Sequence, residues 1–86
     1  MPTISTFYGI SISMWFKDHN PPHFHAEYGG KKASIDIKNL KFLEGELPRR
    51  ATVLVLDWAE IHQEELLKNW ELCQKLQAPH KIKGLE

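Results

Sequence analysis

Residues 23–38, HFHAEYGGKKASIDIK, carry the clearest structural signal in the chain, because apolar and polar side chains alternate on both sides of a Gly-Gly pair. Alternation with a period of two is typical of a strand with one buried face, because successive side chains of a strand point to opposite sides. Two adjacent glycines favour the tight turn of a β-hairpin. The stretch therefore predicts two antiparallel strands, over residues 23–28 and 31–38, joined at Gly29-Gly30.

The segments on either side extend this pattern. Residues 9–16, GISISMWF, alternate in the same way and predict a further strand. Pro21 and Pro22 lack the N–H that a sheet ladder needs, so residues 17–22 are expected to form a stiff loop. Residues 40–47 predict a short fourth strand that ends near Gly45.

The second half of the chain has the composition of a helical region. Pro48 suits the first turn of a helix, and no Gly or Pro follows it until Pro79. Thirty residues are long for one helix in so small a domain, so a break near residues 62–64 and two packed helices are expected. Residues 79–86 either return as an edge strand or hang free.

These elements predict one α+β domain over residues 1–86. A three- to four-stranded antiparallel meander occupies residues 1–47, and two helices within residues 48–78 pack on one face of its sheet. Residues 79–86 form a tail or a short C-terminal strand. A chain of this length is too short to bury two independent cores.

Composition narrows the classes of function. Eleven basic and eleven acidic residues give a formal net charge of zero, so no global field attracts a polyanion, and nucleic acid binding would have to be local. The single cysteine, Cys73, excludes an internal disulfide framework and fits a reducing compartment. No apolar run approaches the length of a membrane span. We therefore expect a soluble, cytoplasmic protein without a membrane partner.

One face of the predicted sheet carries an unusual set of polar side chains. His23, His25 and Glu27 share a face, because residues two apart in a strand point the same way. The hairpin places Asp36 on the neighbouring strand of that face, and Trp15 is expected to join it from the preceding strand. The helices would cover the opposite, aliphatic face and leave this one open.

Three interpretations of the polar face remain open. The histidines can be simple polar side chains beside a Pro-Pro loop. They can be acid–base groups, with His23, His25 and Asp36 as catalytic residues. They can also ligate a divalent metal, with Glu27 completing a two-histidine, one-carboxylate set. Trp15 on the same face is a candidate interface residue.

Arg49 and Arg50 form a second unusual feature, directly after Pro48. Cations at a helix N-terminus oppose the macrodipole, which costs about 0.3–1 kcal/mol each. An anion such as phosphate, held by the guanidinium groups and the helix end, would offset this cost. Local ion pairs with Glu44 or Glu46 would offset it too.

Several blocks of the sequence resemble a known family. The blocks "MPTISTFYGISISMWFKDHNPPHFHAEYGG", "IDI", "EGELPRRA" and "W.EIHQEELLKNWEL" are similar to the small prokaryotic proteins grouped as Domain of Unknown Function 4160. The resemblance covers nearly the whole chain. It implies a component of a toxin–antitoxin-like gene pair, often beside Domain of Unknown Function 2442, and hence a small protein partner encoded nearby. It implies no established reaction, cofactor or catalytic residue.

The first functional hypothesis is a toxin-like protein that acts on RNA or another phosphate-bearing ligand. His23, His25 and Asp36 would handle protons, and Arg49 and Arg50 would hold a phosphate. The absence of net charge argues against strong affinity for RNA.

Two alternatives use the same sheet face. The first is a non-catalytic interaction module, in which Trp15 and the histidines dock a partner protein or a second copy of the chain. The second is a metal-dependent small-molecule enzyme, which requires a divalent cation as cofactor.

Overall fold

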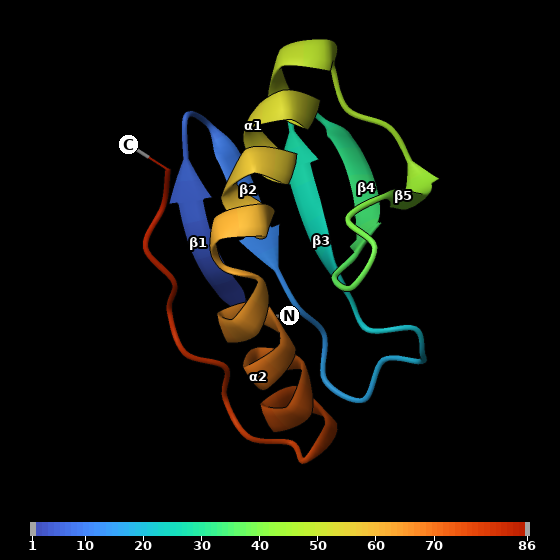
Figure 1. The fold of residues 1–86 in the computed structure, drawn as a ribbon, viewed down its shortest axis with the longest axis vertical. Helices are drawn as coiled ribbons and strands as arrows, with labels where there is room; N and C mark the ends of the chain where they lie inside the picture. The colour runs from blue at the N-terminus through green and yellow to red at the C-terminus, as the bar shows by residue number, and fades with distance from the viewer. Residues whose placement is uncertain (1, 86) are drawn as a thin grey trace.

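The computed structural model describes residues 2–85, which form one antiparallel sheet followed by two helices (Figure 1). The predicted α+β meander is confirmed, because the five strands lie in the sheet in chain order and each pairs antiparallel with the next. The strands are β1 (Thr3–Phe7), β2 (Ile10–Ser13), β3 (His23–Tyr28), β4 (Lys31–Asp36) and β5 (Phe42–Gly45), and the helices are α1 (Arg49–Ile61) and α2 (Gln63–Gln74).

The sheet has five strands in the described residues, whereas three or four were expected. The additional strand is β1, which pairs with β2 at the edge of the sheet. Its register shifts between Thr3 and Ser5, and both Ile4 and Ser5 are buried although they are neighbours in sequence. A bulge of this kind interrupts the alternation of buried and exposed side chains, so the period of two fails in β1.

The β3–β4 hairpin has the predicted turn and pairing. Its register runs from Tyr28 opposite Lys31 at the turn to His23 opposite Asp36 at the far end. Gly29 and Gly30 both have positive φ, of 56° and 84°. Such angles favour glycine, which explains why two glycines occupy this turn.

The helices cover the aliphatic face of the sheet, as predicted. In Figure 1, α1 crosses in front of the central strands and α2 continues beyond the end of the sheet. Trp58 of α1 is fully buried, and its ring lies 5.3 Å from that of Phe7 and 5.8 Å from that of Phe24. The other fully buried side chains of the core are mainly aliphatic: Ile4, Ile10, Ile12, Met14, Ile35, Ile37, Val55 and Leu66.

The expected break in the helical region lies at His62. Its backbone departs from helical angles (φ −109°, ψ 23°), so that α1 ends at Ile61 and α2 begins at Gln63. The Gln63 side-chain amide donates hydrogen bonds to the carbonyls of Ile37 (2.7 Å) and Lys38 (3.1 Å) after β4. The start of α2 is thereby attached to the sheet.

The described part of the C-terminal segment, residues 79–85, forms a tail and not an edge strand, but this tail does not hang free; residue 86 lies outside the described residues. Residues 78–85 form no helix or strand, yet they run beside β1 (Figure 1). The Ile82 N–H donates a hydrogen bond to the Ile4 carbonyl (2.8 Å), and the Trp58 indole N–H donates to the Lys83 carbonyl (2.9 Å). The segment is therefore attached to the edge of the sheet and to the core. Among residues 2–85, neither helix combines the length and the apolar character that a membrane crossing requires.

Candidate functional site

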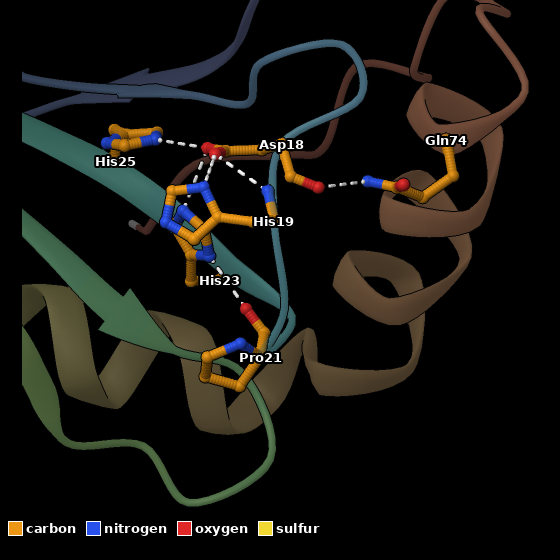
Figure 2. Close-up of polar contacts among 6 residues, drawn as sticks. All are labelled: Asp18, His19, Pro21, His23, His25 and Gln74. Carbon is orange, nitrogen blue, oxygen red and sulfur yellow. Dashed lines mark hydrogen bonds and ion pairs between the residues drawn. The ribbon is translucent and has the colours of Figure 1, made fainter.

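The loop between β2 and β3 carries the first residue of the site. The Lys17 N–H donates a hydrogen bond to the Cys73 carbonyl (3.3 Å), and the Gln74 side-chain amide donates to the Asp18 carbonyl (2.9 Å). Cys73 and Gln74 both lie at the C-terminal end of α2. These contacts hold the loop against the helix, and the Asp18 side chain projects from it toward β3 (Figure 2).

Two histidine rings from β3 converge on that carboxylate. His23 Nε2 lies 2.9 Å and His25 Nε2 lies 3.2 Å from the same atom, Asp18 Oδ2 (Figure 2). The other carboxylate oxygen, Oδ1, accepts a hydrogen bond from the His19 backbone N–H (2.9 Å). We refer to Asp18, His23 and His25 as the Asp18 cluster. Their potential metal-ligand atoms all lie within 4.8 Å of one another.

The three members of the Asp18 cluster differ in their access to solvent. The side chains of His23 and Asp18 are 7% and 8% exposed, whereas that of His25 is 22% exposed. The His23 ring packs against Trp70 of α2, with ring centroids 5.2 Å apart. The His25 ring stacks on Trp15, at 4.4 Å and an interplanar angle of 19°. His25 is thus the most accessible member of the cluster.

The environment keeps the Asp18 carboxyl group ionised at neutral pH. Burial alone would raise its pKa, because it disfavours the charged form. The hydrogen bonds from His25 and from the His19 backbone, together with the interaction with His23, outweigh burial and leave the pKa of Asp18 below its ordinary value. Asp18 therefore presents a carboxylate to the two imidazoles.

A cavity of about 330 Å³ lies next to the Asp18 cluster on the face of the sheet. Trp15 and His25 line it together with Ser13, Ser34 and Lys32. Its remaining lining residues are Ala26, Glu27, Ala33, Glu44 and Gly45. The register explains this set, since Ser13, His25 and Ser34 are direct neighbours across β2, β3 and β4. The volume is in the range of small-molecule sites.

The other carboxylates expected on this face are used differently. Asp36 lies opposite His23 in the hairpin, but its carboxylate accepts hydrogen bonds from the backbone N–H groups of Lys38 (2.8 Å) and Asn39 (3.0 Å). It closes the turn that follows β4. Glu27 lies two residues after His25 on the same face of β3 and is exposed. It lines the cavity but does not belong to the Asp18 cluster.

The two arginines lie at the opposite end of the sheet from the Asp18 cluster. Arg50 lines a separate cavity with Tyr28, the last residue of β3, whereas His23 is the first. Five residue steps of about 3.3 Å put roughly 16 Å between those two ends. Neither Arg49 nor Arg50 has a carboxylate within ion-pair distance among residues 2–85. The structure therefore does not bring the arginines and the histidines into one site.

Asp18 is the site residue that the periodicity did not assign. It precedes β3 by a loop, so no regular spacing relates it to His23 or His25. The only signal in the sequence was its presence in the block DHNPPHFHA, where a carboxylate precedes two prolines and three histidines. A loop stiffened by prolines can return such a residue to the start of the next strand.

Comparison with known proteins gives one match. The family model described as Domain of unknown function (DUF4160) matches residues 9–71, a segment that extends from the start of β2 into α2. No curated protein and no solved structure shows significant similarity to the chain.

Proposed function

The chain belongs to the family of the Domain of unknown function (DUF4160), and we propose that it is an enzyme whose reaction takes place at the Asp18 cluster. The family resemblance supports a place in a toxin–antitoxin-like two-gene module, with this chain as the toxin-like member. The geometry of the cluster supports catalysis, because a carboxylate and two imidazoles can move protons directly or through a bound metal ion.

One observation carries this proposal: His25 belongs both to the Asp18 cluster and to the wall of the neighbouring cavity. A group that is oriented by a carboxylate and also reaches a space large enough for a ligand has the position that a catalytic residue needs. His23 is buried behind it, so the cluster acts on a ligand through His25.

The substrate that we propose is RNA or another phosphate-bearing ligand. Trp15 is 45% exposed and offers an aromatic surface on which a base can stack, while Lys32 supplies a cation within the same cavity. Glu27 and Glu44 also line the cavity, so a single nucleotide unit would be held by stacking more than by charge. Arg50 lies on the helix-covered side of the sheet, in a cavity with Ile10 and Tyr28, so a ligand bound beside Trp15 would have to pass around the sheet to reach it.

Growth of a bacterial host that lacks any partner protein tests the proposal. We expect the wild-type chain to arrest growth, and His25→Ala and Asp18→Asn to relieve the arrest at matched soluble expression. His80→Ala is the matched control, since it removes an exposed imidazole outside the cluster. Absence of arrest by the wild-type chain, or equal arrest by all variants, would contradict the proposal.

A second candidate is a non-catalytic interaction module. Trp15 and Phe16 are neighbours in sequence just beyond β2 and are 45% and 41% exposed, so the two aromatic rings can serve together as anchors for a partner. A small partner protein or a second copy of the chain could bury them. In this case Trp15→Ala abolishes association measured by size-exclusion chromatography with light scattering. His25→Ala, compared at matched folding, tests catalysis separately from association.

A further inference from the structure

The hydrogen bonds of His23 indicate that a cation is needed between His23 and Asp18. Its Nδ1 lies 2.7 Å from the Pro21 carbonyl oxygen (Figure 2), and a carbonyl can only accept, so Nδ1 carries the hydrogen. In the neutral ring Nε2 is then a bare acceptor, and it faces Asp18 Oδ2, another acceptor, at 2.9 Å. Two acceptors in contact require a cation between them, which is either an added proton or a metal ion.

We propose that this cation is a divalent transition-metal ion, ligated by Nε2 of His23, Nε2 of His25 and Oδ2 of Asp18. The proposal deepens the proposed function, because it assigns a cofactor to the cluster on which that function rests. Two histidines and one carboxylate form a known type of metal centre, which leaves the remaining coordination positions open to water or substrate.

The distances agree with such a centre. Metal–ligand bonds of about 2.1 Å place two ligand atoms about 3.0 Å apart when they meet at a right angle. Asp18 Oδ2 lies 2.9 Å from His23 Nε2 and 3.2 Å from His25 Nε2. All three ligand atoms lie within 4.8 Å of one another, so a modest rotation of one ring brings both nitrogens onto one ion.

Contacts around the cluster fix its ligands. The Pro21 carbonyl selects the His23 tautomer that directs Nε2 to the site, an arrangement common among metal-binding histidines. The His19 N–H binds Asp18 Oδ1 and leaves Oδ2 for the ion, while Gln74 holds the Asp18 backbone. The open coordination positions would lie toward His25, whose side chain is the most exposed of the three.

Zinc binding to the purified full chain tests this inference. Zn²⁺ is a sensitive probe, since a site of this type binds it more tightly than it binds Mn²⁺ or Fe²⁺. We expect one Zn²⁺ per chain by isothermal titration calorimetry at pH 7.5, and a visible absorption band when Co²⁺ is used instead. His25→Ala and Asp18→Asn should weaken Zn²⁺ binding by at least about tenfold.

His80→Ala is the control, because exposed imidazoles bind Zn²⁺ weakly on their own, and circular dichroism should show that every variant is folded. Failure of the wild-type chain to bind Zn²⁺ more tightly than His25→Ala and Asp18→Asn would overturn the inference. The titration uses no substrate, so its outcome is independent of growth arrest. A metal-free cluster that still arrests growth refutes only the metal site, and a metal-binding cluster without arrest refutes only the proposed function.

Discussion

Asp36 is a buried carboxylate whose hydrogen bonds all go to the turn that follows β4, at Lys38 and Asn39. Burial raises its pKa, but hydrogen bonds from Asn39 and Lys38 and the charge of Lys41 outweigh burial and hold the pKa below its ordinary value of 3.8. Ionised Asp36 therefore stabilises the fold at pH values above the ordinary pKa. This contribution is lost as the pH falls through the lower pKa of the folded state.

Replacement of Asp36 by Asn tests this role. The amide cannot accept at both former carboxylate oxygens, so we expect the free energy of unfolding to fall by about 1–3 kcal/mol at pH 7. The difference from wild type should shrink as the pH is lowered from 5 to below 3, since protonation removes the same charge in the wild-type chain. Urea unfolding at several pH values measures it. Asp18 titrates in both proteins, so a difference independent of pH would contradict the assignment.

Cys73 lies on the buried side of α2. Burial raises the pKa of its thiol, and its side chain has no exposed surface. A thiolate is the reactive form, so we expect almost no reaction with a thiol reagent such as DTNB in the folded protein at pH 8, and full reaction in urea. Rapid labelling of the native chain would show that α2 opens readily from the sheet.

At the scale of elements, the β4–β5 pairing depends on one glycine. Gly45 has φ of 74°, and a Cβ at this position would lie 2.2 Å from the Lys32 carbonyl oxygen. Gly30 in the β3–β4 turn has a similar φ of 84°, but a Cβ there would meet no atom within 4 Å. The two positions therefore share backbone strain and differ in steric contact.

Substitutions at Gly30 and Gly45 distinguish backbone strain from steric clash. We expect Gly30→Ala to lower the free energy of unfolding by about 1 kcal/mol, the usual penalty for a side chain at positive φ. Gly45→Ala should cost about 1–3 kcal/mol more, because the Lys32 backbone must move. Urea denaturation of both variants measures the difference. Equal losses would mean that β5 separates from β4 without a measurable penalty.

The loop between β2 and β3 is an element whose position is set by α2. Its contacts with Cys73 and Gln74 hold Asp18 over the start of β3, where the two histidines already share a face. The strand supplies the spacing of the imidazoles, and the helix supplies the position of the carboxylate. Neither element forms the cluster alone.

At the scale of the whole molecule, Trp58 connects parts of the chain that are distant in sequence. It contacts Phe7 of β1 and Phe24 of β3, and its indole N–H binds the Lys83 carbonyl in the C-terminal segment. Total stability for a domain of this size is about 4–13 kcal/mol at 0.05–0.15 kcal/mol per residue. One central side chain can therefore account for a large part of it.

We expect Trp58→Ala to lower the free energy of unfolding by about 3–5 kcal/mol, or to unfold the chain at room temperature. Trp15→Ala is the matched control, because Trp15 is 45% exposed and should cost only about 1 kcal/mol through its stacking on His25. Thermal unfolding followed by circular dichroism compares them. Similar losses would show that the core is not centred on Trp58.

Much of the architecture follows from local sequence patterns. The alternation over residues 23–38, the Gly29-Gly30 turn and the break near His62 predicted the hairpin and the two helices, because strand and helix geometry convert spacing directly into faces. The strand β1 escaped prediction since its bulge breaks the period of two.

That His23 and His25 share a face follows from their spacing alone, because residues two apart in a strand point the same way. Which carboxylate joins them depends on long-range packing, since Asp18 is held by Gln74, a residue 56 positions further along the chain. The same packing places Arg50 beside Tyr28, at the far end of β3 from the histidines. Contacts between distant segments depend on how loops and helices pack, and no local spacing encodes that packing.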